Sequence, residues 1–246
     1  MKNEIRVGSN RTGMKASPTE ADEMLEIPEL QAEMPVADPD ADTLRELYRA
    51  EAVPVGTVPP AATISGVFSS VVHALSGQRM PVLLDKLGER AAFERTGTRL
   101  YDAMLVRLAA DDGVELPEGM TLELVQQIRN EEAQHFAMVV EAIEQLGGDP
   151  TTQTPCADLA GVQGMGLLQA MADPRTTLAQ ALQTLLTAEL TDNASWELLI
   201  DLCEGFGLDE LQGRFSQALR HEEQHLLRVR AWLSATVRQQ ALGRPH

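Results

Sequence analysis

The sequence has little cysteine and few aromatic residues. Its two cysteines, Cys156 and Cys203, lie far apart and form no CxxC pair, which excludes a four-cysteine metal site and a dense disulfide framework. Only 4% of the residues are aromatic, and the apolar 43% is dominated by Leu, Ala, Val and Met, which suit helices better than a sheet. The composition therefore predicts an all-helical protein.

The chain also lacks clustered positive charge and long apolar runs. Its net charge is −17, and nucleic acids and anionic membrane surfaces are recognised by clustered Lys and Arg, so we expect neither as a partner. No stretch reaches the roughly 18 apolar residues that a membrane span needs, and the N-terminus has no apolar signal-peptide core. These absences predict a cytosolic protein.

The N-terminal part of the chain is strongly acidic. Residues 20–42 contain nine acidic residues, no basic residue and three prolines, so they cannot bury enough apolar surface to offset the entropy of ordering. We expect residues 1–60 to form a flexible acidic tail and residues 61–246 to form one helical domain. Residues 63–75 are predicted to form a short helix that braces this domain.

Four long apolar stripes with helical spacing follow. They cover residues 81–110 and 121–146, a third stretch from about residue 174, and a fourth after residue 207. About ten residues join the first two stripes and few join the last two, whereas nearly thirty join the second to the third. This pattern predicts an up-down four-helix bundle made of two antiparallel hairpins with one long crossover between its second and third helices.

Ionisable residues interrupt each stripe near its middle, and their spacing is typical of metal ligands. Two stripes carry a Glu and a His three residues apart, which a helix places on one face, so that each pair can hold one metal ion. The other two stripes carry a single Glu that can bridge or cap the ions. The predicted metal ligands are Glu94, Glu132, His135, Glu189, Glu222 and His225.

Charge balance gives a physical reason for the number of glutamates. Even one unpaired buried charge costs several kcal/mol, so four buried carboxylates require compensation. Two divalent cations supply four positive charges, and an oxygen-rich ligand set with two imidazoles suits iron or manganese. We therefore expect two iron ions, or two manganese ions, in the core, and a looser bundle without them.

Three residues near the predicted ligands have open alternatives. Asp192 lies one turn from Glu189 and is either a hydrogen-bond partner of an imidazole or a ligand itself. Tyr101 either packs in the core, or donates a hydrogen bond to a ligand or relays an electron. Gly97 marks either close helix packing or a small opening to the metals.

Five further residues are expected outside the ligand set. Glu131, His221 and Glu223 fall off the ligand face and are predicted to be surface groups or hydrogen-bond partners of the ligands. Trp196 and Trp232 are predicted to pack in the core, with a redox role as the alternative.

The ligand pattern resembles that of the ferritin-like superfamily, which includes ferritins, bacterioferritins, rubrerythrins and related di-iron proteins. The resemblance covers about residues 81–240, and the segment LGERAAFERTGTRLYDAM also resembles the first helix of bacterial ferritin-like domain proteins. It implies a ferritin-like bundle whose iron pair reduces O₂ or H₂O₂. Two features depart from relatives: the cysteine-bound iron module of rubrerythrins is missing, and the acidic tail is unlike compact storage ferritins.

The resemblance further implies a di-iron oxidoreductase of the peroxidase, ferroxidase or oxidase type, active in oxidative stress or iron handling. Its partners would be O₂ or H₂O₂ and an external electron donor, and the chain could form a homodimer or a larger homo-oligomer. Two alternatives stay open: a non-catalytic iron storage or buffering protein, and a di-iron hydroxylase of an organic substrate.

Overall fold

The computed structural model describes residues 41–52, 58, 79–110 and 115–243, and every regular element among them is an α-helix. The chain divides into a unit of Glu4–Pro54 and a unit that includes Val55–His246. The first unit contains helix α2 (Ala41–Glu51), within which Asp42 and Arg45 form an exposed ion pair at 2.8 Å. The sequence prediction had no helix here. Apart from residues 41–52 and Val58, the predicted tail lies outside the described residues, and so does the predicted helix at residues 63–75.

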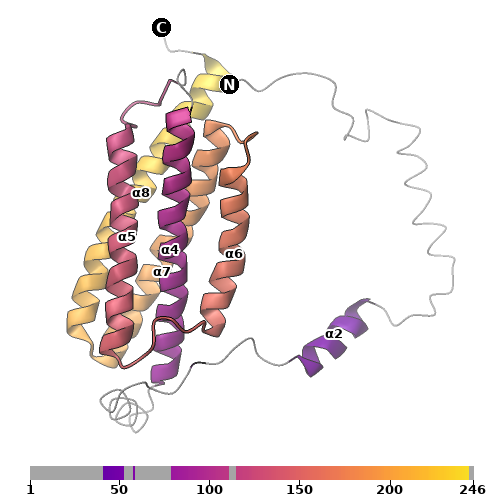
Figure 1. Cartoon of the computed structure of the whole chain (residues 1–246), viewed down its shortest axis with the longest axis vertical. Coiled ribbons are helices and arrows are strands. Elements are labelled where there is room, and N and C mark those ends of the chain that lie inside the picture. Colours follow the sequence, from indigo (N-terminus) through magenta and orange to yellow (C-terminus); the bar gives the residue numbers. More distant parts are fainter. Residues whose placement is uncertain (1–40, 53–57, 59–78, 111–114, 244–246) are drawn as a thin grey trace, which may run out of the picture. The chain divides into compact units, whose positions relative to one another are not determined.

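Four long helices form a bundle in the second unit (Figure 1): α4 (Met80–Ala110), α5 (Leu122–Gln145), α7 (Leu178–Phe206) and α8 (Asp209–Leu242). Helix α4 packs against α5, and α7 packs against α8, as two antiparallel hairpins. The predicted four-helix bundle is confirmed.

Local hydrogen bonds set the helix ends. Thr121 Oγ1 accepts a hydrogen bond from Leu124 N at 3.1 Å and caps α5, as the sequence predicted. Thr177 and Gln180 form a capping box, so α7 begins at Leu178 rather than near residue 174. Gly207 ends α7 with a φ of 68°, a conformation that glycine adopts without steric cost.

The long crossover contains a further helix, α6 (Pro155–Ala172), which the sequence prediction did not include. Thr154 caps it, and Pro155 occupies its first turn, where the missing N–H costs nothing. Its 18 residues span about 27 Å, so it carries the chain back along the bundle before α7 starts (Figure 1). Three glycines within α6 lower its helix propensity, which is why the segment reads as a connection.

Helix α6 packs on α4 through small residues. Ala92 of α4 forms a small buried cluster with Ala157 and Ala160 of α6. A Cβ atom at Gly164 would lie 2.9 Å from Thr96 Cγ2 of α4, which is tighter than van der Waals contact. The two helices therefore lie closer together than larger side chains would allow.

The core of the bundle has two apolar layers. One layer includes Leu83, Leu87, Val139, Trp196 and Phe215. The other includes Leu100, Met104, Ile128, Leu185 and Val229. All four long helices contribute to both layers, and the segment of each helix between the layers carries the predicted ligands. We call this level of the bundle the waist.

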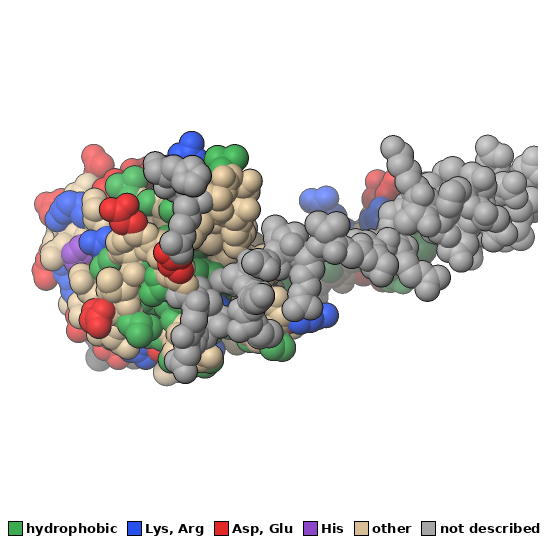
Figure 2. All heavy atoms as spheres, turned by 90° about the horizontal axis from the view of Figure 1, so that it is seen from above, with side chains coloured by type: hydrophobic (Ala, Val, Ile, Leu, Met, Phe, Trp, Pro, Cys, Tyr) green, Lys and Arg blue, Asp and Glu red, His purple; other side chains and the backbone are tan. Residues whose placement is uncertain are grey.

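Among the described residues, the charged side chains outside the waist are exposed or partly exposed. Figure 2 shows acidic side chains spread among basic and apolar ones on the face in view, rather than gathered in one patch. None of the described helices is long and apolar enough to cross a membrane.

Candidate metal centre

The six predicted ligands are all buried at the waist, with relative exposures between 0% and 4%. Glu94 comes from α4, Glu132 and His135 from α5, Glu189 from α7, and Glu222 and His225 from α8. Helical spacing accounts for this placement, because residues three or four apart share a face and each stripe faces the bundle axis. The structure thus brings all six together, each on the helix that the sequence predicted.

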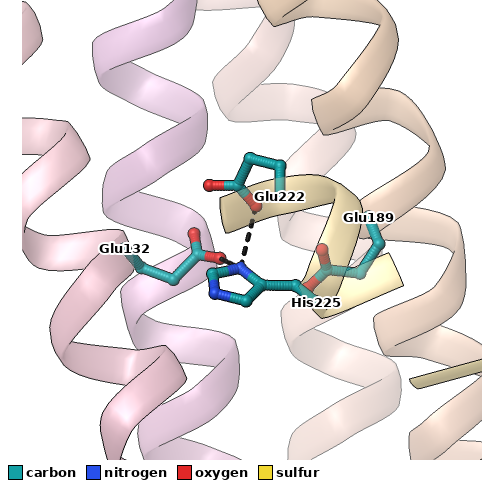
Figure 3. Close-up of side chains that lie close together, drawn as sticks. All are labelled: Glu132, Glu189, Glu222 and His225. Carbon is teal, nitrogen blue, oxygen red and sulfur yellow. Dashed lines mark hydrogen bonds and ion pairs between the residues drawn. The ribbon is translucent and has the colours of Figure 1, made fainter. Parts of the chain in front are cut away.

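The six side chains form two overlapping groups, and within each group one ligand atom per residue lies within 4.8 Å of all the others. We call them the Glu94 position and the Glu189 position. The Glu94 position consists of Glu94, His135 and Glu222. The Glu189 position consists of Glu132, Glu189, Glu222 and His225, whose side chains converge in Figure 3. Glu222 belongs to both, so the geometry offers two adjacent cation positions with a shared carboxylate.

Both imidazoles turn Nδ1 toward the shared carboxylate. His135 Nδ1 lies 2.5 Å from Glu222 Oε1, and His225 Nδ1 lies 2.9 Å from Glu222 Oε2. Glu132 Oε1 is 3.5 Å from the same His225 nitrogen (Figure 3). Each histidine therefore presents one ring nitrogen to the carboxylates at the waist, which is the orientation a metal ligand needs.

The outer ring nitrogens have partners of their own. His225 Nε2 lies 2.7 Å from Glu131 Oε2, and His135 Nε2 lies 3.4 Å from His221 Nδ1. Such outer contacts fix ring orientation in metal-binding histidines. Of the two roles predicted for Glu131 and His221, the structure confirms the hydrogen-bond partner, whereas Glu223 is exposed.

Contacts of Tyr101 and Gly97, both on α4, decide between the alternatives that the sequence left open for these two residues. The Tyr101 hydroxyl donates a hydrogen bond to Glu189 Oε1, and burial, together with the negative charge of Glu189, raises the pKa of Tyr101 well above its ordinary value. A Cβ atom at Gly97 would overlap Glu132 Oε2 and lie 3.0 Å from Glu132 Cδ. Gly97 therefore provides the space that the Glu132 carboxylate occupies.

Arg90 is a buried cation at the waist that the sequence prediction missed. It is 1% exposed, its Nε lies 2.8 Å from Glu94 Oε1, and its Nη2 lies 2.8 Å from Asp192 Oδ1. These are ion pairs rather than aligned hydrogen bonds, since among the described residues neither nitrogen has a hydrogen-bond partner. The guanidinium also lies over the Phe93 ring, 4.5 Å from its centroid, and 5.5 Å from that of Trp196.

The ion pair with Arg90 accounts for the position of the Asp192 carboxylate. The sequence left it as an imidazole partner or a ligand, and in the structure its carboxylate contacts Arg90 instead of a histidine. Arg90 lies four residues before Glu94, on the same helical face, so a charged residue one turn from a buried glutamate was the available signal.

Burial and mutual repulsion disfavour ionisation of most waist carboxylates. Both causes raise the pKa of Glu94, Glu132, Glu189 and Asp192. Burial also opposes ionisation of Glu222, but its close contacts with the His135 and His225 imidazoles lower its pKa to about 2. Burial alone would lower the pKa of His225, yet contacts with Glu131, Glu132 and Glu222 raise it well above the ordinary value.

The waist fits a pair of divalent cations by two criteria. First, several buried carboxylate oxygens have no hydrogen-bond partner among the described residues, and such atoms normally have one. These are both oxygens of Glu94, Oε2 of Glu132, Oε2 of Glu189, Oδ1 of Asp192 and Oε1 of Glu222. Three of them, Glu94 Oε1, Asp192 Oδ1 and Glu222 Oε1, have the ion-pair contacts described above. Second, the charge of Arg90 offsets that of Asp192, which leaves four glutamates for two divalent ions to neutralise. The buried carboxylate and histidine cluster is thus compatible with metal binding.

Comparison with known proteins gives one match. A family model described as a ferritin-like domain matches residues 118–238, which include five of the six predicted ligands. Glu94 and Arg90 lie outside the matched residues, so their part in the site depends on the geometry alone. Searches of curated proteins and of solved structures found no match. The match, the four-helix bundle and its buried waist together show that this chain contains a ferritin-like domain.

Proposed function

We propose that the chain binds two iron ions at the waist and uses them in redox reactions with O₂, H₂O₂ or Fe(II), in oxidative-stress defence or iron handling. One observation carries this proposal: six buried ligand side chains from four helices converge in two groups that share Glu222. Manganese has the same ligand preference and is the alternative metal.

Each predicted ligand has a role in this proposal. Glu94 and His135 would hold one ion, and Glu189 and His225 would hold the other. Glu222 would contribute to both positions, and Glu132 to the Glu189 position. When bound, a pair of Fe(II) ions would supply two electrons, enough with two protons to reduce one H₂O₂ to two water molecules.

The residues around the ligands exclude bulk water from the waist and orient the ligand side chains. The two apolar layers above and below the waist keep bulk water from the ligands, since every ligand is at least 96% buried. The Tyr101 hydroxyl holds one oxygen of Glu189, and Glu131 holds the outer nitrogen of His225. These contacts orient the ligands, which favours a site of fixed geometry.

A small oxidant suits the site better than an organic substrate. A hydroxylase needs a substrate cavity beside its metals. Two pockets, of about 390 and 670 Å³, lie at residues within 170–184 and at residues 115–118 with 235–243, and no predicted ligand contributes to either lining. These two pockets thus favour O₂ or H₂O₂ as the oxidant. From the sequence, we further propose an external protein or small molecule as the electron donor and the cytosol as the compartment.

Anaerobic loading of the purified chain with Fe(II), followed by exposure to O₂ or to H₂O₂, tests the proposal. We expect two Fe(II) per chain to be bound, and one H₂O₂ to be consumed as each pair is oxidised. Remaining Fe(II) is measured with a chelating dye and the oxidant with an electrode. Binding of well under two ions per chain would contradict the proposal. Continued uptake of many ions in a particle of large mass would instead indicate storage.

A further inference from the structure

The two metal positions have different charged neighbours. Arg90 is the one buried Lys or Arg side chain among the described residues, and it contacts Glu94, on one side of the waist only. No Lys or Arg in the described part of the chain is buried beside the Glu189 position. Its outer contacts are the neutral hydroxyl of Tyr101 and the carboxylate of Glu131.

We propose that Arg90 is a built-in counter-cation of the metal centre, which makes the Glu94 position the weaker of the two metal positions. The inference rests on the proposed binding of two metal ions. A fixed positive charge beside Glu94 repels an incoming cation, and it is poorly screened because the guanidinium is buried. Arg90 also engages Glu94 Oε1, which leaves Oε2 as the oxygen on the side of His135, at 3.9 Å from His135 Nδ1.

The contacts of Arg90 also limit the number of metal ions that the waist can hold. A third group of potential ligand atoms lies within 4.8 Å of one another and consists of Glu94, Glu132, Asp192 and Glu222. Arg90 contacts two members of that group, Glu94 and Asp192, and supplies a positive charge there without a metal. The guanidinium therefore takes the place of a third cation, and the waist accepts two divalent ions.

Equilibrium titration with Mn²⁺ tests this inference without turnover. We expect the wild-type chain to bind two Mn²⁺ with unequal affinity. In crystals grown with one equivalent of Mn²⁺, the anomalous peak should lie among Glu132, Glu189 and His225 rather than beside Glu94. A first ion at the Glu94 position would overturn the inference. Absence of any Mn²⁺ or Fe(II) binding would overturn the proposed function as well.

Replacement of Arg90 by a neutral residue should give the clearest change in Mn²⁺ affinity. Arg90→Gln should raise the Mn²⁺ affinity of the weaker position by roughly tenfold or more, because the repelling charge is gone. Arg95→Gln is the matched control, since Arg95 is an exposed arginine on the same helix, and it should leave both affinities unchanged. If Arg90 only supports packing, Arg90→Gln would weaken both positions or leave their affinities unchanged, and either result would overturn the inference.

Asp192→Asn tests the same point with the buried cation in place, which matters if Arg90→Gln does not fold. With its second partner gone, Arg90 is compensated by Glu94 alone, so the weaker position should lose roughly tenfold in Mn²⁺ affinity. The exposed Asp201 on α7 gives the control Asp201→Asn. The double variant Arg90→Gln/Asp192→Asn should return to near the wild-type affinity, because it removes one charge of each sign. A double variant whose weaker position binds Mn²⁺ as poorly as Asp192→Asn alone, or more poorly, would contradict the charge argument.

Discussion

Helix α4 buries two faces in opposite ways. Its waist face carries Arg90 and Glu94, and the charges there are balanced by neighbouring side chains and, in our proposal, by metal ions. Its α6 face carries Ala92 and Thr96 against small residues of α6, and nothing charged is buried there among the described residues. Packing of the waist face depends on charge balance, and packing of the α6 face depends on small side chains. Substitutions on the waist face should therefore change metal binding, and substitutions on the α6 face should change fold stability.

The largest expected effect comes from the shared carboxylate. Glu222→Ala removes a ligand from both metal positions, so we expect loss of both ions and a decrease of at least about 100-fold in the Fe(II) oxidation rate. Metal content by mass spectrometry and stopped-flow kinetics measure the two effects. Glu223→Ala, at an exposed neighbour, should change neither. Retention of two ions in Glu222→Ala would show that the waist is not the metal site.

Gly97→Ala sharpens the comparison from within α4. The new Cβ would overlap the Glu132 carboxylate, so Glu132 must move, and we expect about 10- to 100-fold weaker metal binding at the Glu189 position. Mn²⁺ titration measures this loss. The control is Gly161→Ala on α6, where no described atom lies within 4 Å of the new Cβ. Equal metal affinity in the two variants would remove the role assigned to Gly97.

The metal-free chain should lose stability as the pH rises. Raised pKa values of Glu94, Glu189 and Asp192 mean that the folded state holds protons that the unfolded state releases. Stability from such groups is full below their unfolded pKa and is lost as the pH rises through the folded pKa. The raised pKa of His225 acts in the same direction, whereas Glu222, with a pKa of about 2, acts oppositely and only at acidic pH.

Between about pH 5 and about pH 8, we therefore expect the thermal unfolding midpoint of the metal-free chain to fall by about 10 °C or more. Saturation with Mn²⁺ should abolish most of this fall, because the ions replace the protons. Circular dichroism melts at matched ionic strength provide the measurement. A midpoint that is constant or rises with pH would contradict the arrangement of carboxylates described for the waist.

The smallest effect is expected on the α6 face. Gly164→Ala places a Cβ 2.9 Å from Thr96 Cγ2, so it should destabilise the fold by about 1–3 kcal/mol through overpacking. The metal content should stay at the wild-type value, because no predicted ligand is in contact. Gly166→Ala, with no described atom within 4 Å of its new Cβ, should be neutral or slightly stabilising. Loss of metal in Gly164→Ala would show that the two faces of α4 are coupled.

The sequence predicted the parts of the molecule that depend on helical period. The four stripes placed all six predicted ligands at one level because side chains three or four apart share a face. The hairpins followed from the connection lengths, since a short connection can join only neighbouring antiparallel helices. Whether the six residues bind metal stays a prediction that the Fe(II) and Mn²⁺ experiments test.

The features that the sequence did not predict depend on tertiary contacts. Arg90 looks like an ordinary surface residue of a helix until its partner Asp192, over a hundred positions away, is placed beside it. Helix α6 is glycine-rich and forms because its small residues pack closely on α4, which local propensity does not show. Gly97 had two explanations, and the position of the Glu132 carboxylate selects close packing.

The central claim is that paired cations compensate the buried carboxylates at the waist. Native mass spectrometry of the chain after anaerobic loading with Fe(II) tests it most directly. We predict a plateau at two iron ions per chain, with the second ion added more weakly than the first. A chain that retains no iron, or that gains iron without a plateau, would contradict the account.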